Sequence, residues 1–293
     1  MIEKQDMPGE TLALFSTLNK AAHFAMRILR GVRVRLRRLL VSRKAKLLNK
    51  ELYADYHAVS PQQWSEFTDE IRQFCQARQY SPEYTEGWVS HRYRLYFTLE
   101  WIRKITEEYP GLTIGLEVGG ASIMTDLICQ YFPQLQWQNT NGDLRFPWDI
   151  KDQSVDLIVC TEVLEHLSDI PEGYGDSFFK TGLRAALREA YRVLRPGGVM
   201  LITTPNAASV LHLESVLYGG APWFYQLHVR EYTPDEILLE LQQAGFTIQR
   251  WRTVHCLTID HQKNYSILFH LLLKYHYTVL NRGDDLFLIA QKN

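Results

Sequence analysis

Short apolar runs alternate with amphipathic stretches from residue 112 onward. Five runs rich in Val, Ile, Leu and Thr predict β-strands, at residues 112–118, 135–140, 155–160, 199–204 and 285–291. Apolar residues recur at helical spacing between them, most clearly over 176–194, where Arg195-Pro196-Gly197-Gly198 ends the helix. Strands and helices that alternate in this way build a mostly parallel sheet with helices on both faces. The pattern therefore predicts an α/β fold.

Further helices are predicted by their end signals. Residues 90–111 read as a helix that ends at Pro110-Gly111, and Thr233 begins another, with Glu236 completing a capping box and Gly245 as the stop. The polar residues 61–84 are helical or irregular. A helix is also expected directly after the strand at 155–160.

A basic amphipathic segment precedes these elements. Residues 17–50 contain eleven Lys or Arg and no acidic residue, with apolar residues near helical spacing. Because the whole chain has 32 basic and 33 acidic residues, the remainder has 21 basic residues against 33 acidic ones. This asymmetry predicts a helical extension that contacts phosphates, preferably on an anionic membrane surface and less favourably on nucleic acid. The alternative is a solvated helix without such a partner.

Composition limits the class of protein. With 293 residues, 46% of them hydrophobic, the chain can bury a large core. Its four cysteines form no CxxC pair, so neither a disulfide framework nor a zinc ribbon is predicted. The absence of a secretory h-region and of a long apolar run leads us to expect a cytoplasmic protein, peripheral to the membrane at most.

The first strand ends in a candidate ligand site, Glu117-Val118-Gly119-Gly120. In an open α/β sheet, ligands bind beyond the carboxyl ends of the strands. Glycines there allow backbone amides to approach a ligand, and a carboxylate can bind a ribose hydroxyl or a cationic group.

Four stretches, in this order, carry a family resemblance: "GLEVGG", "GDLRFPWDIKDQSVDLIVCTEVLEHL", "LREAYRVLRPGGVMLITTPN" and "HVREYTPDEILLELQQAGF". Together they resemble the class I S-adenosylmethionine-dependent methyltransferases, in particular the group with ubiquinone-biosynthesis O-methyltransferases and bacterial glycan or lipid methyltransferases. The resemblance implies a Rossmann-like methyltransferase domain at 89–293, preceded by the basic helical extension at 1–88.

The resemblance also implies the residues that bind S-adenosylmethionine. Those expected around its methionine, ribose and adenine are Glu117, Gly119, Gly120, Ala121, Asn139, Asp143, Leu144 and Thr161. Asn139 or Asn141 would replace an acidic ribose-binding residue. Ala121 and Ile123 stand where the family usually has glycine, and only 39 residues separate Glu117 from Asp156. That short interval predicts a loop in place of the second helix.

Glu162, Glu165 and His166 are spaced to share one helix face, and His228 is expected to fold over the same pocket. Two carboxylates and two imidazoles suit Mg²⁺, Mn²⁺ or Zn²⁺. The motif resembles the metal-binding motif of ubiquinone O-methyltransferases and of small-RNA 2′-O-methyltransferases. The alternatives are helix-capping or loop-binding roles for these side chains, and catalysis by His166 as a metal-free general base beside Glu162.

These inferences predict methyl transfer to a hydroxyl of a sugar, a glycolipid or a small molecule. Trp223, Phe224 and Tyr225 would line the acceptor pocket or plug the core. Arg230 would bind an anionic substrate group or form a surface ion pair. Two other functions remain open: a nucleic-acid methyltransferase that uses the basic segment, and a degenerate cofactor-binding module without catalysis.

Overall fold

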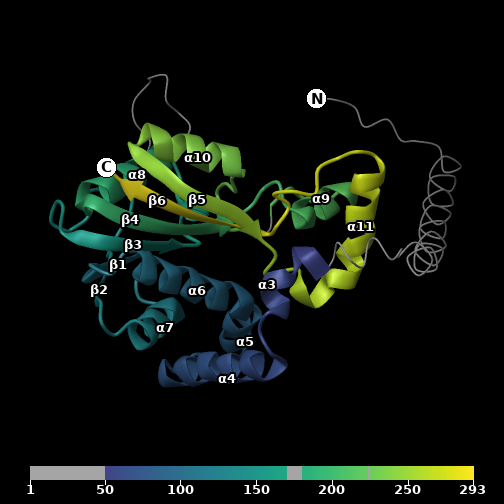
Figure 1. Cartoon of the computed structure of the whole chain (residues 1–293), viewed down its shortest axis with the longest axis horizontal. Helices are drawn as coiled ribbons and strands as arrows, with labels where there is room; N and C mark the ends of the chain where they lie inside the picture. Colours follow the sequence, from purple (N-terminus) through teal and green to yellow (C-terminus); the bar gives the residue numbers. More distant parts are fainter. Residues whose placement is uncertain (1–49, 170–179, 224) are drawn as a thin grey trace, which may run out of the picture.

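A computed structural model describes residues 50–169, 180–223 and 225–293, with backbone only at 261–264. The basic segment, apart from Lys50, and Phe224 lie outside the described residues, as does the start of the helix expected from residue 176. The described part forms one sheet with helices on both faces and a smaller group of helices at one end (Figure 1).

Six strands form the sheet in the described part of the chain. They are β1 (Ile114–Val118), β2 (Gln136–Asn139), β3 (Val155–Thr161), β4 (Leu194–Pro205), β5 (Phe246–Val254) and β6 (Asp285–Lys292), in the order β2-β1-β3-β4-β6-β5. The pairs among β1, β2, β3 and β4 are parallel, and β6 runs antiparallel to both β4 and β5. The mostly parallel, Rossmann-like sheet predicted from the sequence is therefore confirmed.

The strand β5 was missed by the sequence analysis. It lies at the sheet edge, and its sequence FTIQRWRTV mixes polar and apolar residues over a largely half-exposed strand. An edge strand with polar residues lacks the apolar run that identified the central strands.

The described helices of at least one turn have these bounds: α3 (Ala54–His57), α4 (Pro61–Ala77), α5 (Pro82–Ser90), α6 (Arg92–Glu108), α7 (Ile123–Tyr131), α8 (Thr181–Val193), α9 (Val210–Leu217), α10 (Pro234–Gln243) and α11 (Gln262–Lys274). Helices α4 to α7 lie below the sheet in Figure 1, α8 and α10 lie above it, and α3, α9 and α11 gather at one end. The capping box at Thr233 and Glu236 begins α10 as predicted. Within the described residues, no helix has the length and apolar character needed to cross a membrane.

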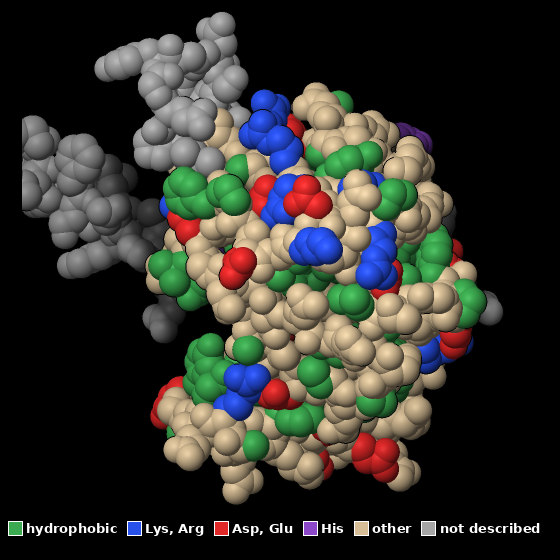
Figure 2. Space-filling view, turned by 90° about the vertical axis from the view of Figure 1, so that its left-hand side faces the viewer, with side chains coloured by type: hydrophobic (Ala, Val, Ile, Leu, Met, Phe, Trp, Pro, Cys, Tyr) green, Lys and Arg blue, Asp and Glu red, His purple; other side chains and the backbone are tan. Residues whose placement is uncertain are grey.

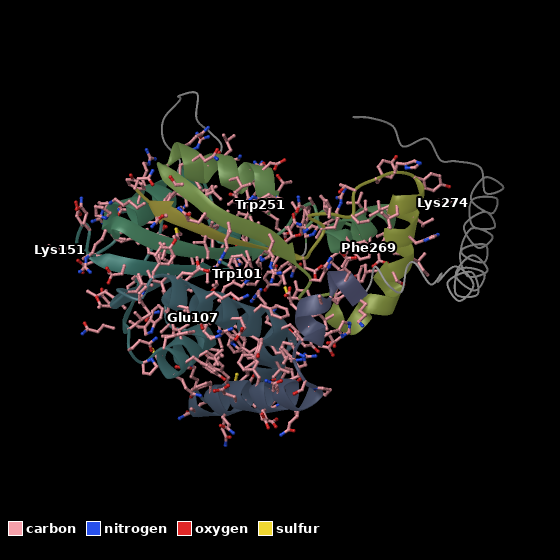
Figure 3. The ribbon with its side chains drawn as sticks, in the orientation of Figure 1. Trp101, Glu107, Lys151, Trp251, Phe269 and Lys274 are labelled. Carbon is pink, nitrogen blue, oxygen red and sulfur yellow. The ribbon has the colours of Figure 1, made fainter. Side chains whose placement is uncertain are left out.

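The helix α6 fills the core below the sheet. Ile102 and Ile105 are fully buried there, and the ring of Trp101 lies 5.6 Å from that of Phe287 in β6. Figure 3 shows Trp101 between α6 and the sheet. Helix α4 adds Trp64 and Phe67 to the same buried cluster. Residues from before position 88 thus share a core with the sheet, while the domain boundary at 88 stays a prediction.

The helix expected directly after β3 is not formed, which corrects the sequence interpretation. Glu162 has a φ of 56°, in the left-handed region, and its N–H donates to the carbonyl of Thr203 in β4 at 2.9 Å. A right-handed helix cannot pass through that conformation. Only a 3₁₀ turn follows, at Leu164–His166. No helix lies between β2 and β3, whose connection is fully described, as the short interval predicted.

Candidate functional site

Two adjoining cavities lie beyond the carboxyl ends of β1 and β3. The strand-end cavity, of about 180 Å³, includes Glu117, Gly119, Gly120, Thr161, Glu162 and Ser122 in its lining. The histidine cavity, of about 380 Å³, includes Glu165, His166, His228, His91, Tyr84 and Tyr225. Trp88, Arg94 and Glu162 line both cavities and form their shared wall.

Glu117 is the carboxylate of the strand-end cavity. It is 3% exposed and accepts hydrogen bonds from Asn139 Nδ2 at 2.7 Å, from Ser122 Oγ at 3.2 Å and from Thr125 Oγ1. Burial raises its pKa, which these three donors partly offset. β1, β2 and the first turn of α7 thus converge on one buried carboxylate.

The turn after Glu117 needs glycine at its first position. Gly119 and Gly120 have φ values of 113° and 87°, a region that other residues rarely adopt. A Cβ on Gly119 would also lie 2.8 Å from Val163 Cγ2, whereas one on Gly120 would meet nothing within 4 Å. The backbone at Gly119 therefore lies close to Val163, just beyond β3. Gly120 has no neighbour on its open side, so the turn is accessible from the cavity.

The other predicted cofactor residues divide into two sets. Thr161 lines the strand-end cavity and Asn139 contacts Glu117 directly. Ala121, Asp143 and Leu144 are not in the cavity lining. Arg145 pairs with Asp143 at 2.6 Å and holds the pKa of that carboxyl at about 2, while Leu144 is buried in the core cluster that also contains Val118. Ala121 lies between Gly120 and Ser122, which both line the cavity. The cofactor roles of these three residues stay predictions.

Glu162 stands in the shared wall as half of an ion pair. Its Oε2 lies 2.8 Å from Arg94 Nη1, its Oε1 accepts from Thr203 Oγ1 at 2.9 Å, and the two charged side chains are only 14% and 12% exposed. Burial raises the pKa of Glu162 to about 7 against the opposing effect of the Arg94 charge. The carboxyl can therefore gain or lose a proton near neutral pH.

Glu165, His166 and His228 form a compact cluster on the histidine cavity. One ligand atom from each lies within 4.8 Å of those of the other two. The backbone positions them, because the carbonyl of Glu165 accepts from the N–H groups of Val229 and Arg230 at 2.8 and 3.1 Å. Glu162, which its spacing placed in the same set, is instead engaged by Arg94 and Thr203.

Glu231 orients His228. The Nδ1 atom of His228 lies 2.5 Å from Glu231 Oε1, and the other oxygen of Glu231 contacts Nε2 of His212. His212 in turn reaches Ser209 Oγ through Nδ1 at 2.5 Å. A carboxylate that binds Nδ1 leaves the lone pair on Nε2, the arrangement typical of metal-binding histidines.

The cluster has the electrostatics of a cation site. Glu165 is fully buried and its Oε1 has no hydrogen-bond partner, while its Oε2 accepts from Thr204 at 3.0 Å. Burial, and then the charge of Glu162, raise the pKa of Glu165 well above its ordinary value. Burial and the nearby His228 lower the pKa of His166, so its imidazole is neutral at pH 7. A neutral imidazole and an unsatisfied carboxylate oxygen are both suited to ligating a metal.

Sequence reasoning missed Arg94, Trp88 and His91. Arg94 carried a usable signal, because it lies in register with the buried stripe of α6 at Thr98, Trp101 and Ile105. An arginine on an apolar face needs a buried carboxylate partner. Trp88 and His91 stand at the junction of α5 and α6, and nothing in their spacing indicates a cavity.

Two lesser predictions have clear outcomes. Tyr225 lines the histidine cavity, but Trp223 is 50% exposed and plugs no core. Arg230 pairs with Glu236 at 2.5 Å, the surface ion pair that was one of its two predicted roles. A larger hollow, of about 690 Å³, lies between α4, α6 and α7, away from the strand ends, and contains no histidine or glycine.

The chain belongs to the methyltransferase-domain family, whose sequence profile matches residues 45–250. The class I S-adenosylmethionine-dependent methyltransferase family predicted from the motifs is thereby confirmed, while the subgroup stays a prediction. A probable S-adenosylmethionine-dependent methyltransferase of Mycolicibacterium smegmatis is 32% identical over 137 residues, which cover 46% of this chain and 44% of that protein.

A demethylmenaquinone methyltransferase of Tropheryma whipplei is 29% identical over 141 residues, covering 42% of this chain and 52% of that protein. The chain thus matches about half the length of these two relatives. A solved S-adenosylmethionine-dependent methyltransferase from Archaeoglobus fulgidus aligns with a TM-score of 0.45 and 14% identity, over 71% of this chain and 99% of that one.

Glu165→Gln is expected to stabilise the metal-free protein at alkaline pH. Because its pKa is raised by folding, ionised Glu165 opposes folding, and this penalty grows as pH rises above the ordinary carboxyl pKa. Glutamine can still accept from Thr204 but carries no charge. In urea unfolding with a chelator at about pH 8, we expect the variant to gain on the order of 1–3 kcal/mol in unfolding free energy.

The gain in unfolding free energy of Glu165→Gln should disappear at about pH 4.5, where Glu165 of the wild type is protonated in the folded state. Glu66→Gln, at an exposed position of α4, is the matched control and should show no gain at either pH. A Glu165→Gln variant that is no more stable than wild type at the higher pH would contradict this electrostatic account.

Proposed function

We propose that this protein is an S-adenosylmethionine-dependent methyltransferase that methylates a hydroxyl oxygen of a sugar, a glycolipid or a small molecule. The observation that carries the proposal is the shared wall of the two cavities, formed by Trp88, Arg94 and Glu162. One cavity has the glycine turn and buried carboxylate that suit the cofactor, and the other has imidazoles that suit a hydroxyl. Membership of the methyltransferase-domain family supports the same assignment.

The strand-end cavity would hold the methionine and ribose part of the cofactor. Glu117 is the acceptor for a ribose hydroxyl or the ammonium group, and the turn at Gly119 and Gly120 allows the cofactor to approach the backbone. Glu162, at the end of β3, would face the cationic sulfur. The negative charge of Glu162 would attract the cationic sulfonium of the cofactor.

The methyl group is already activated, so the protein supplies alignment, shielding and a proton acceptor. The carbon–sulfur bond breaks as the carbon–oxygen bond forms, the sulfur leaves as a neutral thioether, and the hydroxyl proton must go to a base. Glu162, with a pKa of about 7 and a position on both cavity walls, is one acceptor for that proton. His166, which is neutral at pH 7, is the other candidate.

A divalent cation, Mg²⁺, Mn²⁺ or Zn²⁺, would be held by Glu165, His166 and His228. The fit rests on the mutual proximity of their ligand atoms, the unpartnered Oε1 of buried Glu165 and the Glu231 contact of His228. When bound, such a cation lowers the pKa of a coordinated hydroxyl. In that case His166 is a ligand and Glu162 is the remaining proton acceptor.

The cofactor assignment is tested with Glu117→Gln. The substitution removes the charge but keeps a side chain of the same shape among Ser122, Thr125 and Asn139. We expect it to weaken S-adenosylhomocysteine binding by roughly 10- to 100-fold in titration calorimetry, because a charge-assisted hydrogen bond is lost. Glu100→Gln, at an ion pair on the outer face of α6, should leave the affinity unchanged.

A wild-type protein that binds neither S-adenosylmethionine nor S-adenosylhomocysteine at millimolar concentration would remove the enzyme assignment. The degenerate module would then be the better account. Equal affinities for wild type and Glu117→Gln would instead mean that the bound cofactor does not contact the Glu117 carboxylate.

The cation is tested by thermal unfolding after chelation. A ligand that binds only the folded protein raises Tm with its concentration. We expect Mn²⁺ or Zn²⁺ to raise the Tm of the wild type by several degrees, but not that of Glu165→Gln or His228→Ala. His57→Ala, at an exposed histidine at the end of α3, is the matched control and should respond as the wild type does.

The rate of methyl transfer should also fall when the metal is removed from the enzyme by a chelator. This is assayed on an acceptor identified by screening. Full turnover by metal-free enzyme, with no Tm response to any of the three cations, would exclude the cation. His166 and Glu162 would then be the two candidate bases, and His166→Gln separates them: if His166 is the base, the variant loses the limb of the pH–rate profile that reports its ionisation.

A further inference from the structure

Exposed apolar side chains gather in two segments at one end of the protein. Leu217 at the end of α9 is 65% exposed, and Leu280 in the connection from α11 to β6 is 71% exposed. Other large hydrophobic residues of these segments are at least 39% exposed: Val216, Tyr218, Trp223, Tyr225, Leu227, Val229, Leu271, Tyr275 and Tyr277. We refer to these residues, with Leu217 and Leu280, as the apolar face.

The two segments belong to helices that pack on each other. Val210 of α9 and Phe269 and Leu272 of α11 form a small buried core. In Figures 1 and 3 these helices stand at the end of the molecule beside α3, with Lys274 labelled on α11. Because this pair of helices already buries its own core residues, the exposed leucines and tyrosines are additional to what the fold needs.

The two segments that carry the apolar face contain no acidic residue. Residues 215–229 and 261–283 include no Asp or Glu, although acidic residues outnumber basic ones outside the basic segment. Lys274 and His276 are exposed beside Tyr275 and Tyr277. The opposite end of the molecule differs, since basic and acidic side chains there lie next to each other (Figure 2).

The basic segment enters the fold beside this face. Its last residue, Lys50, is where the described chain begins, and Leu52 packs against the α9–α11 core. Tyr53 donates a hydrogen bond to Thr258 Oγ1 at 2.9 Å, shortly before α11 begins. The sequence that carries the eleven cationic residues of 17–50 therefore joins the described part of the protein at this end.

We propose that the apolar face docks on an anionic phospholipid surface. Tyrosine and tryptophan prefer the membrane interface, exposed leucines insert below the head groups, and nearby cations are attracted to acidic lipids. A second copy of the chain fits less well, because a twofold contact would pair two copies of a surface that carries Lys274 and has no acidic residue in its segments to complement it.

The docking surface adjoins the histidine cavity. Tyr225 and His228 line that cavity from the loop that also carries Leu227 and Val229. Docking would therefore hold the cavity close to the head-group layer. If the proposed function holds, the acceptor hydroxyl belongs to a lipid head group or a lipid-linked sugar.

The test is co-sedimentation of the full-length protein with vesicles. The variant Leu217→Glu/Leu280→Glu places charges on the apolar face, and Leu239→Glu is the matched control, since Leu239 is 51% exposed on the distant α10. Vesicles of phosphatidylcholine with about one-third phosphatidylglycerol are compared with pure phosphatidylcholine, at low and at raised salt, because salt weakens the attraction of the basic segment more than apolar insertion.

We expect the double variant to bind phosphatidylglycerol vesicles at least about tenfold more weakly than wild type and Leu239→Glu, with the difference persisting at raised salt. Equal binding of wild type and double variant would overturn the proposal. So would a wild-type dimer that the double variant dissociates, because the face would then be an interface between copies. S-adenosylhomocysteine binding on the same samples reports separately on the fold and on the proposed function.

Discussion

The guanidinium of Arg94 is the charge on which the site depends. It pairs with Glu162 at 2.8 Å and lies close enough to Asp285 and Glu165 for their charges to influence it. Arg94 is one buried cation among several buried carboxyls. Burial, and then the charges of neighbouring carboxyls, raise the pKa of Glu162 to about 7 and that of Asp285 to about 6 against the opposing effect of Arg94. A cationic cofactor or a divalent cation nearby would favour the ionised form of these carboxyls.

The same residue explains why the two cavities adjoin. Helix α6 begins at Arg92 and runs beneath the sheet, so its first turn brings Arg94 to the ends of β1 and β3. The left-handed conformation of Glu162 turns its carboxylate toward this guanidinium and ends the strand without starting a helix. The following 3₁₀ turn then presents Glu165 and His166 to the loop that carries His228.

The sheet was predictable because its central strands are buried on both faces and therefore read as apolar runs. The edge strand β5, which mixes polar and apolar residues without a regular alternation or an apolar run, was not. The carboxyl end of β1 was identified from Glu117 and its glycines, whereas Asp143 and Leu144 were assigned by resemblance and lie outside the cavity lining. Glu165 and His166 were grouped from their spacing, although the helix that this spacing assumed is not formed, and His228 was added from its expected place over the pocket. Glu162 was assigned to the same set, but its contacts with Arg94 and Thr203 join segments that are distant in sequence, which local spacing does not encode.

The most direct measurement is a crystal structure of the protein with S-adenosylhomocysteine and Mn²⁺, with anomalous data to locate the metal. The account predicts the cofactor in the strand-end cavity, with its sulfur beside Glu162 at the shared wall. It also predicts one anomalous peak at coordination distance from Glu165, His166 and His228. Cofactor bound away from Glu162, so that the histidine cavity does not face its sulfur, would contradict the account.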